Sequence, residues 1–184
     1  MFALVLAAAV AAGLAPTATA APAPRPSPAD APPKALEGLA VFEGTWACES
    51  LSDEGVPPPV RSRMTIAREL DGFWYAGRAT DEKSEAEPRP ATRLFFWSYD
   101  NVLGKFVGGW LDSRGGWSAQ TSPDWADDKL VFLGHVTATG EKVTARETFT
   151  RPAQGVFRRR YEILGFIEFQ LIREDTCRKQ DSGP

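Results

Sequence analysis

From residue 42 onward, hydrophobic and polar residues alternate in short runs that are separated by turn sequences. Alternation with a period of two is typical of half-buried β-strands, and dipeptides such as Asp71-Gly72 and Thr139-Gly140 are typical of tight turns. No convincing long stretch has the period of an amphipathic helix. The pattern predicts ten strands, at residues 42–50, 63–70, 73–80, 92–99, 105–112, 116–121, 129–136, 142–150, 156–164 and 166–174.

One short helical segment precedes these strands. Leu36, Leu39 and Phe42 are spaced by three residues, which suits one or two helical turns, and Gly44 then provides a stop. Ten short strands joined mostly by tight turns predict an antiparallel meander, and closure of such a meander removes its exposed edges. We therefore expect an all-β fold, a single antiparallel up-and-down β-barrel of about 8–10 strands, with the short N-terminal helix closing one end.

Two connections are long, residues 51–61 and 81–90. Solvated loops are the simpler interpretation, and an overhang above the barrel mouth is the functional alternative.

The first twenty residues carry no charged side chain and end in Ala18-Thr19-Ala20. An apolar run followed by small residues predicts a secretory signal peptide over residues 1–20, whereas a transmembrane anchor would need a more strongly apolar stretch. Residues 21–33 are rich in Pro and Ala and predict an extended linker. The barrel domain is then expected at residues 34–179 and a flexible tail at 180–184. The expected location is periplasmic or extracellular, with no integral membrane association after cleavage.

The chain contains two cysteines, Cys48 near the start of the barrel domain and Cys177 near its end. In an exported protein two cysteines suggest one disulfide, which here would tie the ends of the domain together. The net charge of −3 argues against nucleic acid as a partner. We expect no cofactor and no metal site, because His135 is the only histidine and both cysteines are expected to be bonded.

Several motifs together resemble the lipocalin-like (calycin) barrels, and in particular a bacterial exported family of unknown function. They are "FEGTWAC", "LDGFW", "FFWSYDNVLGKFVGGWLDSRGG" and a terminal Cys-Arg. The resemblance implies that Trp46 closes one end of the barrel beside a basic side chain from near the C-terminus, with Arg173 or Arg178 as candidates. It carries no catalytic residues. The second lipocalin motif, Thr-Asp-Tyr, is absent, so a ten-stranded fatty-acid-binding or nitrobindin-like barrel stays open.

Aromatic residues are abundant on the expected strands, and such residues either fill a barrel or line a cavity in it. The leading hypothesis is that the barrel binds a small apolar or amphipathic molecule, at the end away from Trp46 and below residues 51–61. Alternatives are an enzyme site at the barrel mouth, with His135, Asp112 or an inward arginine as candidates, and a filled barrel with a structural or interaction role in the envelope. The candidate ligand-binding residues are Trp74, Phe96, Trp110, Phe132, His135 and Arg146.

Arginines are expected among the apolar positions of the strands. Arg68, Arg146 and either Arg158 or Arg159 share a strand face with apolar neighbours. Inward arginines would pair with acids such as Glu69 or Glu147, or would meet the anionic head of a ligand.

Overall fold

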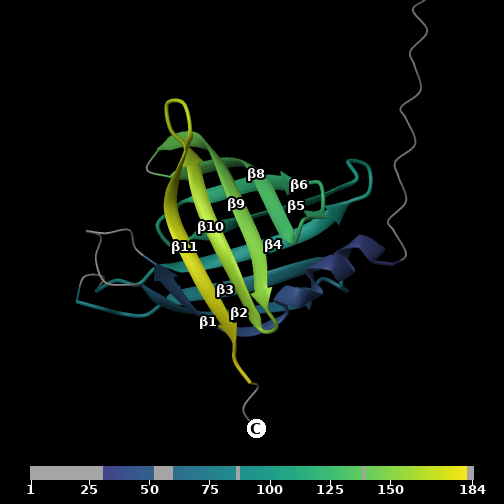
Figure 1. The fold of residues 1–184 in the computed structure, drawn as a ribbon, viewed down its shortest axis with the longest axis horizontal. Coiled ribbons are helices and arrows are strands. Elements are labelled where there is room, and N and C mark those ends of the chain that lie inside the picture. The colour runs from purple at the N-terminus through teal and green to yellow at the C-terminus, as the bar shows by residue number, and fades with distance from the viewer. Residues whose placement is uncertain (1–30, 52–59, 86–87, 139, 182–184) are drawn as a thin grey trace, which may run out of the picture.

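A computed structural model describes residues 31–51, 60–85, 88–138 and 140–181 of the chain. Its main feature is a closed antiparallel β-barrel, drawn in Figure 1. The strands are β1 (Gly44–Leu51), β2 (Arg61–Glu69), β3 (Trp74–Asp81), β4 (Thr92–Asp100), β5 (Lys105–Asp112), β6 (Trp117–Ser122), β7 (Trp125–Ala126), β8 (Lys129–Ala138), β9 (Glu141–Ala153), β10 (Val156–Leu164) and β11 (Phe169–Lys179).

Ten of these strands form the wall of the barrel. The sheet order is β6-β5-β4-β3-β2-β1-β11-β10-β9-β8-β7, and an additional pairing between β6 and β8 closes the ring. Strand β7 contains two residues and pairs only with the start of β8. Strands that pair in the ring also follow one another along the chain, with two exceptions. These are the first and last strands, β1 and β11, and the strands β6 and β8. The prediction of an up-and-down antiparallel barrel of about 8–10 strands is confirmed.

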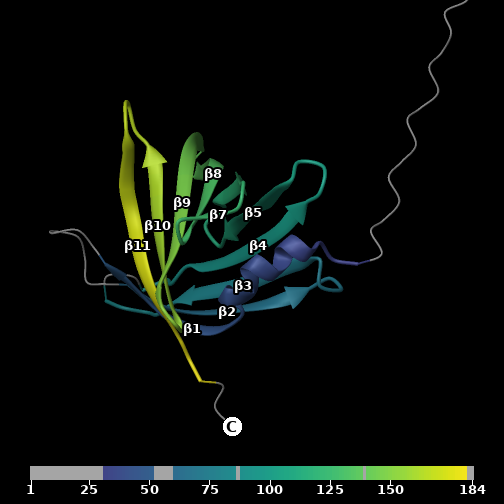
Figure 2. The same cartoon turned by 45° about the vertical axis from the view of Figure 1, so that its right-hand side comes forward.

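A 3₁₀ helix, η1 (Lys34–Phe42), leads into the first strand. Leu36, Leu39 and Phe42 are all buried, because a spacing of three residues places side chains on one face of a helix with three residues per turn. The helix packs against β4 and lies along the inside of one end of the barrel (Figure 2).

The junction between η1 and β1 depends on a glycine and a tryptophan. Gly44 has a φ of 127°, a left-handed conformation that L side chains rarely adopt. Two residues later, Trp46 is buried and its Nε1–H donates a hydrogen bond of 2.8 Å to the carbonyl of Phe42. The indole therefore fixes the end of η1 against the first strand.

Strands β1 and β11 are also joined covalently. Cys48 lies directly opposite Cys177 in the antiparallel register, and the two form a disulfide across 129 residues of sequence. The predicted disulfide is confirmed. It links the first and last strands of the barrel, so it fixes the closure of the ring at this seam.

We call the end of the barrel that holds η1 the closed end, and the end with the β3–β4, β5–β6 and β10–β11 connections the mouth end. Aromatic side chains fill the closed half. Phe42 stacks on Trp97 and Trp125 and meets Phe149 and Phe157 edge to face, with centroid distances of 5.2–6.0 Å. This half of the interior is a packed core.

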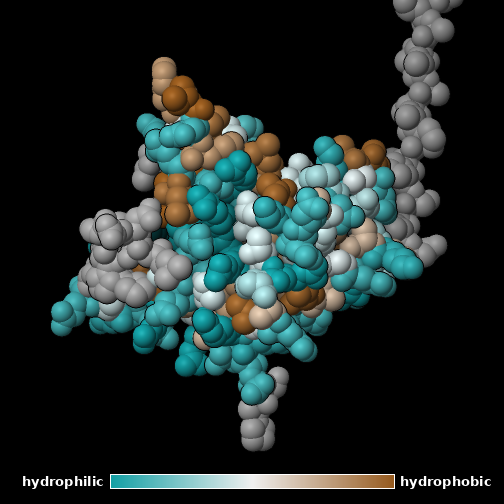
Figure 3. Space-filling view, in the orientation of Figure 1, coloured by the Kyte–Doolittle hydropathy of each residue, from teal (hydrophilic) through white to brown (hydrophobic). Residues whose placement is uncertain are grey.

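The last strand differs from its prediction. Residues 166–174 were expected to be extended after a turn at Gly165, but β11 begins at Phe169 and reaches Lys179. The turn occupies the intervening residues, because the amide of Gly165 donates to the carbonyl of Glu168. Phe166 and Ile167 are consequently exposed at the tip of the β10–β11 hairpin, at the top of Figure 1, where the surface is brown in Figure 3.

The expected signal peptide at 1–20 and most of the expected linker at 21–33 lie outside the described residues, as does most of the 51–61 connection. Within the described part of the chain, no helix combines the length and apolar character needed to cross a membrane.

Candidate functional site

A network of buried charges occupies the interior of the barrel between its middle and the mouth end. It contains three arginines and three carboxylates whose side chains point inward from five strands. They are Asp81 on β3, Arg93 on β4, Glu147 on β9, Arg159 on β10, and Arg173 and Asp175 on β11. The opposite charges are equal in number, so the network is close to neutral.

Arg159 is the most deeply buried of the three arginines. Its Nε donates to Glu147 Oε2 at 3.0 Å and its Nη1 donates to Asp175 Oδ2 at 3.1 Å. The guanidinium also lies 5.6 Å from the ring centre of Phe95 and 5.5 Å from that of Tyr161. Arg159 therefore joins β9, β10 and β11 inside the barrel.

Glu147 also connects the network to the opposite wall. Trp110, on β5, donates its Nε1–H to Glu147 Oε1 at 2.8 Å. Both carboxylate oxygens of Glu147 consequently accept a hydrogen bond, as a buried carboxylate requires. This bond spans the interior, because β5 and β9 are not neighbours in the sheet.

Towards the mouth end, Asp175 and Asp81 each hold more than one partner. Asp175 Oδ1 accepts from Arg173 Nε at 2.6 Å and from the hydroxyl of Ser50 at 2.7 Å. Asp81 receives both terminal nitrogens of Arg93, at 3.2 and 3.3 Å, and lies 3.6 Å from Arg173 Nη2. Arg173 thus bridges the two carboxylates.

The environment shifts several pKa values in the network. Burial would raise the pKa of Asp175, but Arg159 and Arg173 hold it below its usual range. Burial would likewise lower the pKa of Arg159, but Glu147 and Asp175 raise it above its ordinary value. For Arg93, burial and then the charge of Arg173 lower the pKa in spite of Asp81.

Two members of the network are partly exposed. The side chains of Arg93 and Arg173 are 20% and 18% exposed, whereas that of Arg159 is 9% exposed. A guanidinium carries five N–H donors, and the ion pairs to described residues engage only part of them. Arg93 and Arg173 can therefore donate hydrogen bonds to a further oxygen atom.

The parts of β9 and β10 that lie nearest the mouth, beyond Glu147 and Arg159, have apolar side chains. Val143 on β9 and Tyr161 and Ile163 on β10 are partly buried and pack against the core. Burial, and next the charge of Glu147, raise the pKa of Tyr161 to about 12. Near the mouth, the interior thus has charged side chains on β3, β4 and β11 and largely apolar side chains on β9 and β10, beyond Glu147 and Arg159.

The structure places only two of the six predicted ligand-binding residues inside the barrel. Trp110 and Phe132 point inward and are buried. The other four, Trp74, Phe96, His135 and Arg146, lie on the outer face, and their prediction as interior residues is corrected. The reason is that successive side chains of a strand point to opposite faces. The inward positions are taken by immediate neighbours: Tyr75 beside Trp74, Phe95 and Trp97 beside Phe96, Val136 beside His135, and Ala145 and Glu147 beside Arg146.

Of the arginines predicted to point inward, Arg159 does so and pairs with Glu147, as one of the predicted alternatives stated. Arg146 forms a two-bond ion pair with Glu162 on the outer face, and the hydrogen bond from Arg146 holds the pKa of that carboxyl below its usual range. Arg68 donates to the hydroxyl of Tyr75 at 2.9 Å. Glu69, the other acid predicted to pair with an inward arginine, forms no ion pair with another described residue.

The basic side chain beside Trp46 is neither Arg173 nor Arg178. Lys179 Nζ lies 5.7 Å from the Trp46 ring centre, and Arg173 belongs to the interior network. Arg173 and Lys179 both point inward on β11, but Lys179 is at the closed end and Arg173 near the mouth.

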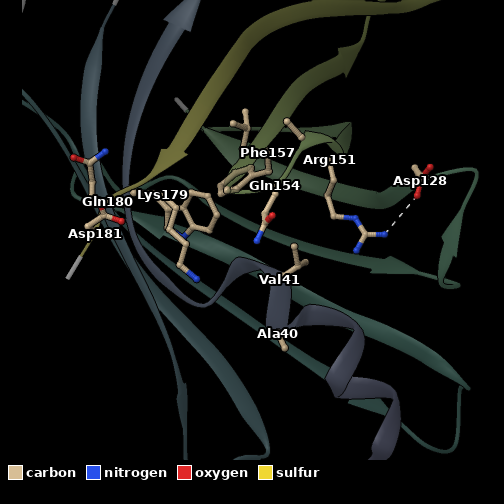
Figure 4. Close-up of a pocket in the computed structure, with 13 residues that line it drawn as sticks. Ala40, Val41, Asp128, Arg151, Gln154, Phe157, Lys179, Gln180 and Asp181 are labelled. Atoms are coloured by element: carbon tan, nitrogen blue, oxygen red, sulfur yellow. Dashed lines mark ion pairs between the residues drawn. The ribbon is translucent and has the colours of Figure 1, made fainter.

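A separate hollow lies at the closed end, outside the barrel core (Figure 4). It measures about 930 Å³ and is bordered by the end of η1, the β9–β10 turn and the end of β11. Lys179 and Gln154 project into it, while Arg151 lies 3.6 Å from Asp128 and stacks on Trp125. This hollow is open to solvent, and the Trp46 ring is only 2% exposed. A ligand would therefore find little enclosed surface there.

A smaller hollow of about 510 Å³ lies at the mouth end, lined by Arg89, Pro90, Ser113 and Arg114. Asp112, one of the residues considered for acid–base work, stabilises the neighbouring turn: its Oδ1 accepts from the amides of Arg114 and Gly116, both at 2.8 Å. His135 is exposed on the outer face and cannot serve the interior. Among the described residues, no group of histidine, cysteine and carboxylate side chains is arranged to hold a metal ion.

Sequence reasoning missed Asp81, Arg93 and Asp175. The pattern that could have identified them is the alternation of side chains along a strand, because each of the three lies two positions from a buried residue. Arg93 alternates with Phe95, Asp175 with Cys177, and Asp81 with Ala79. A charged residue two positions from a buried one on the same strand is expected to point inward.

Comparison with known proteins supports the fold alone. No family model matches the chain, and no curated protein matches it. Among solved structures, the crystal structure of Rv2717c from M. tuberculosis is similar, with a TM-score of 0.60 over 81% of this chain and 99% of that chain. The sequence identity of 10% extends the likeness no further than the barrel architecture.

Proposed function

We propose that this chain is an exported, lipocalin-like binding protein that holds a small amphipathic molecule with an anionic head in the mouth half of its barrel. The head, a carboxylate or a similar oxyanion, meets Arg93 and Arg173. The apolar part lies against Val143, Tyr161 and Ile163.

The observation that carries the proposal is the presence, near the mouth, of charged side chains on β3, β4 and β11 beside apolar side chains on β9 and β10. A barrel that only needed a stable core could fill this half with aromatic side chains, as it does in the closed half. Burying ion pairs gives little net stability compared with apolar packing. Partly exposed arginines are the usual means of recognising planar oxyanions.

Export is supported by the N-terminal sequence and by the disulfide. Residues 1–20 have the pattern of a signal peptide, and disulfides such as Cys48–Cys177 persist mainly in oxidising compartments. The motifs that resemble the exported lipocalin-like family also favour export. The mildly acidic chain is proposed to bind a small molecule and not nucleic acid.

The test is a fluorescence titration with dansylaminoundecanoate and with its methyl ester, which keeps the chain and removes the charge. The expected result is that the carboxylate binds at least about tenfold more tightly, since a hydrogen bond to a charged group contributes about 1.5–3 kcal/mol. Arg93→Gln and Arg173→Gln should remove this preference, and Arg93→Lys should retain part of it. Arg158→Gln, exposed on the outer face of β10, is the matched control and should change nothing.

Unfolding midpoints of all variants are measured in parallel, so that loss of binding is separated from loss of the fold. If neither probe binds the folded protein, or if both bind equally and the Arg93 and Arg173 variants have no effect, the proposed function is wrong.

A further inference from the structure

One side of the barrel has an outer face without any charged residue. The outward positions along the central parts of β4, β5, β6 and β8 contain no Lys, Arg, Asp or Glu. We call this surface the charge-free face and define it by Leu94, Phe96, Val107, Gly109, Leu111, Trp117, Ala119, Thr121, Val131, Leu133 and His135.

The apolar side chains of this face are adjacent to one another. Leu94 lies opposite Leu111 in the β4–β5 register, and Leu111 lies opposite Trp117 in the β5–β6 register. They are 40%, 48% and 42% exposed, and Leu133 on β8 is 49% exposed. Leu94, Leu111 and Trp117 therefore form a continuous apolar surface, while Leu133 lies further along the face, opposite Thr121 on β6 and Arg146 on β9.

The same face contains a shallow apolar groove of about 470 Å³. Trp74 and Phe96 form one side of it, with ring centres 6.1 Å apart, and Leu133 and His135 lie across it. Gly109, beside the groove, leaves room for the Phe96 ring, since a Cβ there would lie 2.0 Å from the carbonyl oxygen of Ser118 and 3.1 Å from that ring. The groove accounts for three of the residues that sequence reasoning had assigned to an interior ligand site.

The rest of the barrel has a different surface. Outward positions on β1, β2 and β10 include Glu49, Arg61, Arg63, Arg158 and Arg160. The outer surface over β9, β10 and β11 is mostly hydrophilic in Figure 3. Apolar side chains are also exposed on the β10–β11 hairpin, at Leu164, Phe166, Ile167 and Ile172. The charge-free face differs from that region in having no charged residue at the outward positions of its central strands.

We propose that the charge-free face is a self-association surface, on which a second copy of this chain packs sheet against sheet. A face without charges offers no cations to an anionic lipid surface and no ion-pair partners to a charged protein. The same face on another copy does match it, because a two-fold contact sets apolar side chains against apolar side chains and buries no unpaired charge.

The dimensions suit a small, reversible dimer contact. With strands about 4.8 Å apart and about 3.3 Å per residue, the face from β4 to β8 covers roughly 15 Å by 20 Å, and on β3 it ends at the outward Arg78, opposite Leu94. Such a contact is smaller than the ~800 Å² per partner of a standard interface, which is typical of weak association. Two such sheets pack about 10 Å apart with interdigitated side chains. The inference is independent of the ligand proposed for the interior.

Sedimentation velocity of the disulfide-bonded protein between about 1 and 100 µM tests the proposal. We expect a reversible monomer–dimer equilibrium. Leu111→Arg and Trp117→Arg should each weaken dimerisation at least about tenfold, because each introduces a charge at the centre of the contact. The matched control is Ile172→Arg on β11, which is 53% exposed on the charged side of the barrel and should dimerise like the wild type.

Far-UV circular dichroism and unfolding midpoints establish that each variant is folded. A wild-type protein that stays monomeric at the highest concentration overturns the proposal, and so does a monomer that instead sediments with lipid vesicles. A dimer that neither Leu111→Arg nor Trp117→Arg weakens also overturns it, since the contact would then lie elsewhere.

Discussion

Arg159 and Glu147 form an ion pair inside the barrel, with 3.0 Å between Nε and Oε2, although both side chains are less than 10% exposed. Glu147 is held from the opposite wall by Trp110, and Arg159 reaches Asp175 on the other side. The pair therefore sits at the centre of a network that connects strands across the interior.

The first prediction concerns removal of the central charge. Arg159→Met should lower the free energy of unfolding by about 3–5 kcal/mol, because Glu147 and Asp175 would lose a buried partner. Arg158→Met, one residue away on the outer face, should change it by less than about 0.5 kcal/mol. Urea unfolding followed by tryptophan fluorescence measures both. Equal effects of the two substitutions would contradict the placement of Arg159.

The second prediction concerns acid stability. The pKa of Asp175 is lowered in the folded protein, mainly by Arg159 and Arg173 against the opposing effect of burial. A depressed pKa contributes stability above the unfolded value of about 3.9, and this contribution is lost as the pH falls below it. Urea unfolding at pH 7 and pH 3 should therefore show a smaller loss of stability for Asp175→Asn than for the wild type. An equal loss in both proteins would show that Asp175 is not stabilised by its arginines.

The third prediction concerns alkaline pH. Burial and the charge of Glu147 raise the pKa of Tyr161 to about 12, so this tyrosine stays protonated in the folded state after an unfolded chain has ionised near pH 10. The unfolded state then binds fewer protons, and stability falls as the pH rises from about 10 towards 12. Absorbance titration at tyrosinate wavelengths should lose one late-titrating group in Tyr161→Phe. The same curve for wild type and variant would contradict the assignment.

The fourth prediction concerns the seam between β1 and β11. Replacing Cys48 and Cys177 together by Ala should lower the free energy of unfolding by up to about 4–5 kcal/mol, since the disulfide closes a loop of 129 residues in the unfolded chain. The effect should be absent when both proteins are compared under reducing conditions. Two free thiols in the folded, exported protein would contradict the bond itself.

Much of the architecture follows from local signals. Turn glycines such as Gly72 and Gly140 adopt positive φ, as their dipeptides predict, and the spacing of Leu36, Leu39 and Phe42 anticipates the helix that they bury. Cys48 and Cys177 lie in register because strand closure brings the two ends of the meander together. These features depend on residues close in sequence or on closure alone.

The candidate site could be predicted less well from such local signals. In the run Leu94-Phe95-Phe96-Trp97 every residue is apolar, so alternation cannot reveal which face points inward, and Phe96 was assigned to the wrong side. The surroundings of Trp74 and His135 give the same ambiguity, because the charge-free face is nearly as apolar as the interior. Partners across the barrel, such as Trp110 and Glu147, depend on curvature, which no local pattern encodes.

The central claim is that the mouth half of the barrel receives an anionic head at Arg93 and Arg173. A crystal structure of the protein with dansylaminoundecanoate tests it most directly. The account predicts that carboxylate oxygens lie about 3 Å from the guanidinium nitrogens of both arginines, with the alkyl chain against Tyr161 and Ile163. A probe bound in the closed-end hollow beside Lys179, or an empty mouth at saturating probe, would contradict it.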